Sequence, residues 1–176
     1  MKIGILSDTH DYLPNIRKAI ELFNREKVEM LIHCGDFVSL FVIKEFKNFK
    51  GKIWATYGNN DGERTKLKEW LKELNPENEI DDYLTFKIED LKFFVLHGTN
   101  REVLEAIIKS KNYDVVIYGH THKRVFKEED GVLVINPGEC CGYLSGTATV
   151  GIFDTETKEY REFVLKGGNL EVGDRE

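Results

Sequence analysis

A buried strand that turns abruptly polar opens this chain and constrains its fold more than any other feature. Residues 3–6 read Ile-Gly-Ile-Leu, and Asp8 and His10 follow within four residues. Side chains two residues apart on extended backbone project from the same face, so both are expected to point at one partner. The alternative is that Asp8 caps the next helix, which has Pro14 in its first turn, while His10 makes an ordinary hydrogen bond.

The same change from apolar to polar recurs at four more predicted strand ends. The residues that follow these strands are Asp36 after 28–32, Asn59 and Asn60 after 52–56, His97 after 91–96, and His120 and His122 after 115–118. Because the carboxyl ends of parallel strands share one edge of a sheet, we expect these side chains to meet there. Taken alone, the Asn-Asn-Asp segment would be a plain turn, and the last two histidines would be surface residues.

Helical and strand-like patterns alternate in the first half of the chain, and antiparallel hairpins follow. The helices predicted from apolar spacing cover residues 14–26, 40–46, 64–74 and 103–109. The strands cover residues 2–6, 28–32, 52–56, 83–88, 91–96, 115–118, 132–135, 147–153 and 160–165. This order predicts one α/β domain with mixed sheets over residues 1–166, followed by a tail, 167–176, that is expected to fray.

The composition limits which binding partners and which cellular compartment are expected for this protein. The net charge is −6 and the pI about 5.5, which argues against general nucleic-acid binding and against an anionic membrane surface. The apolar runs are too short for a membrane span, and we expect no signal peptide and a cytoplasmic location. The three cysteines, Cys34, Cys140 and Cys141, form a poor disulfide framework and are expected to be reduced, packed thiols.

The polar groups at the strand ends suit borderline divalent metals. Imidazole, carboxylate and amide oxygen without thiolate are ligands for Mn²⁺, Fe²⁺, Co²⁺, Ni²⁺ or Zn²⁺. They are more numerous than one catalytic ion needs when a coordination position must stay open. Two ions that share a carboxylate would use them, and such pairs, roughly 3.5–4 Å apart, suit phosphoryl chemistry.

The order of these motifs resembles that of a known family. Ser-Asp-Thr-His, Cys-Gly-Asp, Gly-Asn-Asn-Asp, a single histidine and Gly-His-Thr-His follow one another as in the calcineurin-like metallophosphoesterase superfamily. The short length and the segment Ile135–Glu139, Ile-Asn-Pro-Gly-Glu, resemble its small single-domain archaeal and bacterial phosphodiesterase branch. The resemblance covers roughly residues 1–165 and implies two mixed β-sheets packed as a sandwich and flanked by helices.

The resemblance also implies a reaction, hydrolysis of a small-molecule phosphate ester, in particular a phosphodiester, by a hydroxide held between two metal ions. The implied cofactors are two divalent ions, with Mn²⁺ first and Ni²⁺, Co²⁺, Fe²⁺ or Zn²⁺ as alternatives, and a homodimer is plausible. The implied ligands are Asp8, His10 and His122 for one ion, Asn59, His97 and His120 for the other, and Asp36 as the bridge.

Two departures from the superfamily pattern place the proton donor in question. Asn60 stands where Gly-Asn-His-Asp has its histidine, and Thr99 stands where His-Gly-His has its second one. Asn60 is therefore predicted to contact the substrate in catalysis through a hydrogen bond, and it cannot act as a general acid. Arg124 is a second candidate contact for an anionic substrate, or else a solvated surface charge. His33 and Cys34 are interpreted as structural.

Two other function classes stay open at this point. The superfamily contains a retromer subunit of the same fold with an altered metal site, so a non-catalytic interaction scaffold is one alternative. A phosphomonoesterase or nucleotidase is the other.

Overall fold

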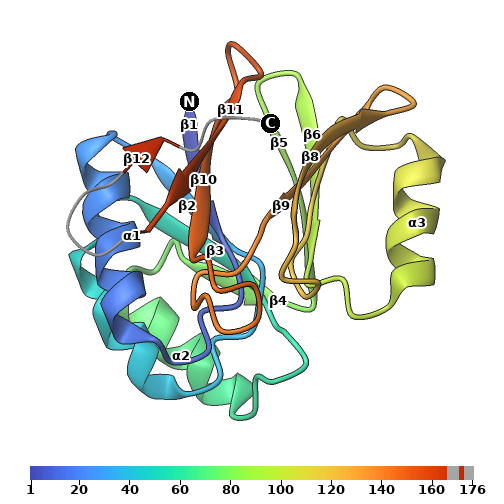
Figure 1. The fold of residues 1–176 in the computed structure, drawn as a ribbon. Coiled ribbons are helices and arrows are strands. Elements are labelled where there is room, and N and C mark those ends of the chain that lie inside the picture. The colour runs from blue at the N-terminus through green and yellow to red at the C-terminus, as the bar shows by residue number, and fades with distance from the viewer. Residues whose placement is uncertain (166–170, 173–176) are drawn as a thin grey trace.

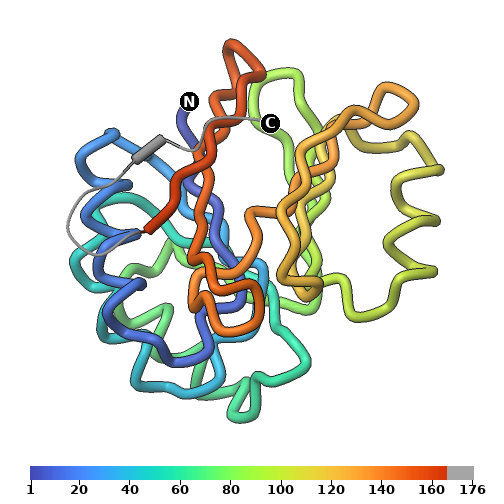
Figure 2. The backbone as a smooth tube through the Cα atoms, viewed as in Figure 1, coloured from blue at the N-terminus to red at the C-terminus, as the bar shows by residue number. Residues whose placement is uncertain are grey.

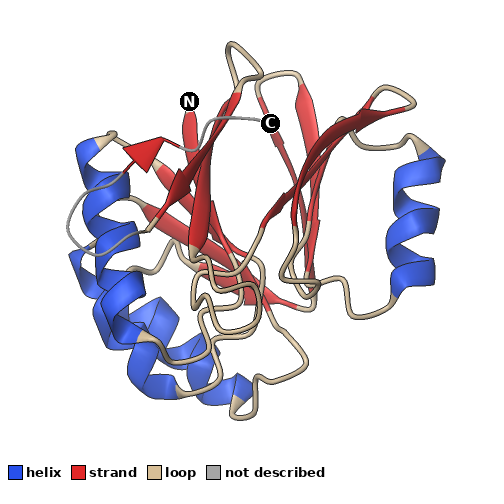
Figure 3. Ribbon diagram, in the orientation of Figure 1, coloured by secondary structure: helices blue, strands red, loops and turns tan. Residues whose placement is uncertain are grey.

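Two β-sheets face each other, and helices cover their outer sides, in the computed structural model (Figures 1 and 3). It describes residues 1–165 and the backbone of 171–172. The predicted class, an α/β fold with two mixed sheets flanked by helices, is confirmed. The predicted fraying of the tail falls largely on residues outside this description and stays a prediction.

The first sheet has seven strands in the order β12-β11-β10-β1-β2-β3-β4. Its strands are β1 (Lys2–Leu6), β2 (Met30–His33), β3 (Lys52–Thr56), β4 (Glu79–Asp81), β10 (Thr149–Asp154), β11 (Tyr160–Val164) and β12 (Glu171–Val172). The strands β1 to β4 run parallel, and β10 returns antiparallel to β1. Figure 2 shows this return, with the orange-to-red end of the chain beside the blue first strand.

The second sheet has five strands in the order β5-β6-β7-β9-β8. Its strands are β5 (Tyr83–Ile88), β6 (Leu91–Leu96), β7 (Val115–Ile117), β8 (Arg124–Glu129) and β9 (Val132–Pro137). The central strands β6, β7 and β9 run parallel, whereas β5 and β8 are antiparallel edges. Each sheet therefore has a set of parallel strands whose carboxyl ends share one edge.

The helices lie on the outer faces of the two sheets (Figure 1). The first sheet is covered by α1 (Leu13–Arg25), the 3₁₀ helix η1 (Leu40–Asn48) and α2 (Arg64–Leu74), and the second by α3 (Arg101–Ser110). The side chain of Asn100 caps α3 by accepting from the backbone N–H of Val103. Within the described residues, none of the helices has the length and apolar character to cross a membrane.

Three apolar layers stack through the molecule because strands in both sheets are buried on both faces. One layer lies between the first sheet and its helices, and another between the second sheet and α3. The layer between the sheets includes Ile3, Ile5, Ile32, Phe93, Val95 and Ile117, all fully buried. The alternation of apolar residues along β1 and β6 thus places one sheet against the other.

Three strands were not predicted, and one of them, β12, lies within the predicted tail, 167–176. The strand β8 was not predicted, because its sequence, Arg-Val-Phe-Lys-Glu-Glu, has the charges of an exposed edge and no regular apolar alternation. The strand β4 was not predicted because it has only three residues. The helix predicted over 40–46 is present as a 3₁₀ helix over Leu40–Asn48.

Candidate metal centre

The seven side chains predicted as metal ligands all come to one place, where the parallel strands of both sheets end. They lie on the loops that follow five strands: Asp8 and His10 after β1, Asp36 after β2, Asn59 after β3, His97 after β6, and His120 and His122 after β7. In Figure 3 these loops gather at one end of the sandwich, between the sheets. The convergence depends on the facing of the two sheets, since three of the strands belong to one sheet and two to the other.

Asp8, His10 and His122 form one half of the site. His122 Nε2 lies 3.3 Å from Asp8 Oδ1, and His10 Nε2 lies 3.9 Å from the same oxygen. His10 Nε2 also lies 3.6 Å from Asp36 Oδ2. The rings of His10 and His122 are stacked, with centroids 5.3 Å apart. Three of the predicted ligands thus surround one small volume next to Asp36.

His97, Asn59 and His120 form the other half. His97 Nε2 lies 3.1 Å from Asn59 Oδ1 and 3.4 Å from Asp36 Oδ2. The ring of His120 meets the ring of His97 edge-on at a centroid distance of 5.1 Å. The same carboxylate oxygen, Asp36 Oδ2, is therefore close to a histidine of each half, which is the position required of a bridging ligand.

Two observations fit these residues to a pair of divalent metals: the separations between their ligand atoms, and two buried polar atoms that have no hydrogen-bond partner. Two ligands each about 2.1 Å from one ion, at tetrahedral or octahedral angles, are themselves roughly 3.0–3.4 Å apart, close to the separations found here. Asp8 Oδ1 and His10 Nε2 are buried and have no hydrogen-bond partner. A buried carboxylate oxygen without a donor is costly, and a cation bound between these atoms would remove that cost.

The ligand loops use a backbone conformation that few residues adopt. The φ angles of Asp8, His10, Asp36, His120 and His122 lie between 42° and 62°, in the left-handed region. The expectation that Asp8 and His10 lie on extended backbone is therefore wrong: each sits on a left-handed turn, and they still converge. Such conformations cost on the order of 1–3 kcal/mol each and concentrate where function requires a side chain in an unusual place.

Asp36 is held as an anion at the centre. Burial by itself raises its pKa, but the interaction with His97 and the donors of Asn60 outweigh burial, and the pKa falls well below its usual range. The backbone N–H and the side-chain amide of Asn60 each donate to this carboxylate at 2.8 Å. Gly58 allows the close approach, since a Cβ there would collide with the carboxylate. The predicted substrate contact, Asn60, thus lies directly on the predicted bridge.

Asp61 ties the two loops around Asp36 together. Its carboxylate accepts from the backbone N–H groups of Asp36 at 3.0 Å, Val38 at 2.8 Å and Gly58 at 2.7 Å. The sequence pattern explained Asp61 only as the end of a turn motif. Its three bonds join the loop after β2 to the loop after β3, so Asp36 and Asn59 keep a constant separation.

The tautomer of a metal-binding histidine is set by the partner of the ring nitrogen that points away from the site. His97 Nδ1 lies 2.6 Å from the backbone oxygen of Cys34, which can only accept, so Nδ1 carries a proton. Nε2 is therefore the nitrogen that faces the site and that could give its lone pair to a metal. Burial lowers the pKa of His97, but the interaction with Asp36 outweighs it and raises the pKa overall. The charge of Asp36 that favours a proton on His97 favours a metal cation in the same way.

Glu139 is a functional residue that the sequence reasoning did not assign. It is fully buried, and its Oε2 lies 2.7 Å from His122 Nδ1. Burial raises its pKa, yet donors from Ser145, His122 and Cys141 outweigh burial and lower the pKa to about 2. An ionised Glu139 can only accept, so His122 Nδ1 carries the proton and Nε2 faces Asp8. A signal existed: residue 139 follows the parallel strand β9, as the other site residues follow theirs.

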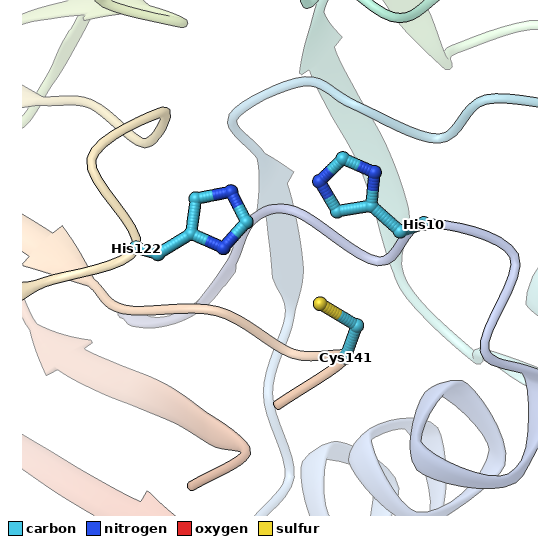
Figure 4. Close-up of side chains that lie close together, drawn as sticks. All are labelled: His10, His122 and Cys141. Carbon is cyan, nitrogen blue, oxygen red and sulfur yellow. The ribbon is translucent and has the colours of Figure 1, made fainter. Parts of the chain in front are cut away.

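Cys141 lies against both histidines of the first half. Figure 4 shows its sulfur pointing toward the rings of His10 and His122, and the ligand atoms of all three lie within 4.8 Å of one another. Its thiol donates to Glu139 Oε2 at 3.1 Å, and burial raises its pKa to about 12. Cys141 is therefore a neutral thiol that helps to hold Glu139, in keeping with the interpretation of the cysteines as packed thiols.

His33 lies behind the site, as expected of a structural residue. It is fully buried, and its ring stacks on Phe37 with centroids 3.5 Å apart. Nδ1 accepts from the backbone N–H of Gly35, so Nε2 donates to Thr9 Oγ1, which in turn donates to the backbone oxygen of Asp36. Burial holds the pKa of His33 well below its usual range. His33 therefore positions the loop of Asp36 and has no route to a substrate.

Arg124, the other residue predicted to contact the substrate, is the first residue of β8. Its guanidinium donates to Glu162 Oε1 at 2.7 Å. Thr99 lies at the site itself, where its hydroxyl donates to Asn59 Oδ1 at 3.4 Å. A role for Arg124 toward the substrate stays a prediction.

Comparison with known proteins identifies the family. A family model described as the calcineurin-like phosphoesterase superfamily domain matches residues 1–158. The chain belongs to this superfamily. It is 72% identical over 166 residues to a phosphodiesterase of Methanocaldococcus jannaschii, an alignment that covers 94% of this chain and 100% of that protein. Membership supports a metal-dependent phosphoesterase and confirms the resemblance seen in the motifs.

Solved structures agree with this assignment. The structure described as a novel archaeal phosphodiesterase matches with a TM-score of 0.92 and 73% identity, over 94% of this chain and 100% of that one. Vps29 of Chaetomium thermophilum matches with a TM-score of 0.74 at 15% identity, over 98% of this chain and 94% of that one. The second likeness shows a shared fold alone.

The contact between Glu139 and His122 generates a first prediction. Glu139→Gln removes the charge and places an amide among donors, so His122 loses its fixed tautomer and orientation. We expect the affinity for Mn²⁺ to fall about 10–100-fold, as for other second-layer partners of histidine ligands. Isothermal titration of the metal-free protein with Mn²⁺ measures this. Glu128→Gln, which alters an exposed carboxylate on β8, is the matched control, and equal affinities in the two variants would contradict the assignment.

Proposed function

We propose that this protein is a phosphodiesterase that uses two divalent metal ions. The observation that carries the proposal is the position of Asp36 Oδ2, 3.6 Å from His10 Nε2 and 3.4 Å from His97 Nε2, with further ligand groups beyond each histidine. The phosphodiesterase name of the relative that is 72% identical supports the diester as substrate class. Mn²⁺ is the first candidate metal, and Ni²⁺, Co²⁺, Fe²⁺ or Zn²⁺ would suit the same ligands.

The chain offers one ligand set for each ion. Asp8, His10 and His122 would hold the first, Asn59, His97 and His120 the second, and Asp36 would lie between them. When bound, such ions lower the pKa of a coordinated water to about 7 and so supply a hydroxide nucleophile at neutral pH. The protein contributes a ligand shell in which Asp36 is already ionised and His97 and His122 already present Nε2.

Asn60 is the residue placed to act on the substrate. Its side-chain amide donates to Asp36 Oδ2, the oxygen that a bridging ligand would give to the metals. With that oxygen engaged, the amide would be free to donate to a phosphoryl oxygen instead. The backbone N–H of Asn60 keeps its bond to the other oxygen, Oδ1, so Asn60 would stay next to the bridge during this exchange.

Of the histidines that the structure describes, His10, His97, His120 and His122 would be engaged as metal ligands, which leaves His33 as the remaining candidate acid. Asn60 and Thr99 occupy the positions where relatives of the superfamily have histidines, and neither is an acid at neutral pH. His33 is buried with both nitrogens engaged. The departing oxygen would therefore leave with help only from metal, water or the Asn60 amide, and weakly basic leaving groups are favoured.

The central carboxylate supplies the decisive test of the proposal. Asp36→Asn keeps the shape but removes the charge between the two ions, so we expect kcat/KM for an aryl phosphodiester at saturating Mn²⁺ to fall by more than about 100-fold, with unchanged circular dichroism. Cys34→Ser, two residues earlier in the same buried segment, is the comparison. Equal activity in the two variants would remove Asp36 from the site.

The same preparation separates the alternatives. Turnover of diesters over monoesters and dinucleoside polyphosphates supports the proposal, and faster turnover of monoesters would favour a phosphomonoesterase. Metal binding without turnover of any phosphate ester would favour a scaffold.

The missing acid generates a further prediction. General acid catalysis typically contributes about 10²–10⁴-fold, and more as the leaving group becomes more basic. We expect a steep dependence of log kcat/KM on leaving-group pKa across a series of aryl phosphodiesters, and a shallower one in Asn60→His. The series is measured on both proteins at saturating Mn²⁺, with Asn60→Gln as the control that adds no acid. A shallow dependence in the unaltered protein would mean that another group supplies the proton.

A further inference from the structure

A pocket of about 330 Å³ opens directly beside the candidate metal centre. It lies between the loop after β3 and the start of α3, and its lining includes Tyr57, Asn59, Arg64, His97, Thr99 and Val103. Two of these, Asn59 and His97, are also ligands proposed for the second metal. A phosphoryl group held at that metal would therefore have one of its substituents next to this pocket, which is at the small end of the size range of ligand sites.

Arg64 and Tyr57 form a flat wall of the pocket. The guanidinium lies over the Tyr57 ring, with Cζ 4.9 Å from the ring centroid. Nη1 donates to Asp82 Oδ1 at 2.8 Å, and Nη2 donates to the backbone oxygen of Gly58 at 3.3 Å. The Tyr57 hydroxyl donates in turn to the backbone oxygen of Arg64. These contacts hold the guanidinium in one orientation, with two of its five N–H donors used and Tyr57 on one face.

The charge on this wall does not suit a second phosphate. Asp82 neutralises Arg64 and itself belongs to the lining of the pocket, so its carboxylate would repel an anion placed there. The side chain of Arg64 nevertheless remains 46% exposed. A guanidinium with hydrogen bonds in its plane and an aromatic ring on one face offers its other face for stacking, which is how arginine binds flat rings.

Val103 and Leu96 add apolar surface to the pocket. Val103 lies in the first turn of α3, is 47% exposed and belongs to the pocket lining, and Leu96 lies in the same lining. The backbone N–H of Val103 bonds to the side chain of Asn100, so the cap of the helix determines where this side chain lies. An exposed branched aliphatic group and a guanidinium held in one orientation thus line the same pocket, and together they suit a ligand that is flat and apolar.

We propose that this pocket binds a flat aromatic group attached to the phosphoryl group of the substrate. The ring would stack on Arg64 and contact Val103 while the phosphoryl group occupies the metal centre. The inference rests on the proposed function, because the metals place the phosphoryl group. Both an aryl ester and a nucleotide carry such a ring, at different distances from phosphorus, and the experiment distinguishes these two sources.

The test measures binding by isothermal titration calorimetry to protein saturated with Mn²⁺. Phenylphosphonate is compared with methylphosphonate, and adenosine 5′-monophosphate with ribose 5-phosphate; the two members of each pair differ in the ring. We expect the ring to strengthen binding about tenfold in at least one pair, the range found for stacking on arginine and aromatic side chains. The pair that shows the gain identifies the source of the ring.

Four variants locate the effect. Val103→Gln replaces the apolar surface with a polar side chain of helical propensity, and Arg64→Gln removes the stacking surface; each is expected to reduce the gain to less than about twofold. Leu74→Gln, a similar replacement of an exposed aliphatic side chain on α2 outside the pocket, is expected to keep the full gain. Tyr143→Gln alters an exposed aromatic side chain that contacts Tyr12 and lies outside the pocket lining, and it is expected to keep the full gain as well.

Each outcome has one meaning. No gain from the ring in either pair, while methylphosphonate or ribose 5-phosphate binds in a Mn²⁺-dependent manner, overturns this inference and leaves the proposed function standing. A gain that survives in Val103→Gln and Arg64→Gln but is lost in Tyr143→Gln overturns the location. Absence of Mn²⁺-dependent binding by all four compounds overturns the proposed function and this inference with it.

Discussion

The carboxylate of Asp36 is the interaction on which the rest of the site depends. It is nearly fully buried, yet it stays ionised because His97 and both N–H groups of Asn60 stabilise its charge. Its backbone sits in the left-handed region and is held there by Asp61. One oxygen of this group faces a histidine from each half of the site, so the negative charge that would attract two cations lies where both can share it.

The site around this charge contains conformations and buried groups that lower the stability of the folded protein. Left-handed turns, buried imidazoles and unpaired atoms such as Asp8 Oδ1 are each unfavourable in a protein that binds nothing. Bound cations would offset several of these costs at once, so metal affinity and folding free energy are coupled here. The partners behind the ligands, Glu139 on His122 and the Cys34 carbonyl on His97, reduce the remaining freedom by fixing which nitrogen faces the site.

A fold shared with another protein does not by itself show that the two proteins catalyse the same reaction. The sandwich also matches Vps29 at 15% identity, a level at which the likeness concerns the fold alone. The assignment to metal-dependent phosphoesterases rests on the family match, and the proposal of a two-metal phosphodiesterase rests on the seven converging side chains and their distances. Selectivity among phosphate esters would then be set beside the metals, by residues such as Arg64 and Val103 that take no part in the metal ligand set.

The sequence by itself determined the fold class, the family and the ligand candidates, because apolar strands ending in Asp, Asn and His are local signals. It did not predict the left-handed turns, the role of Glu139 or the exposed edge strand β8, which depend on neighbours distant in sequence. Tertiary structure alone decided that Asp36 faces both His10 and His97, and that Val103 and Arg64 share a pocket. The physical reason is that the apolar layer between the two sheets holds them face to face. A local sequence pattern does not predict how one sheet is aligned against the other.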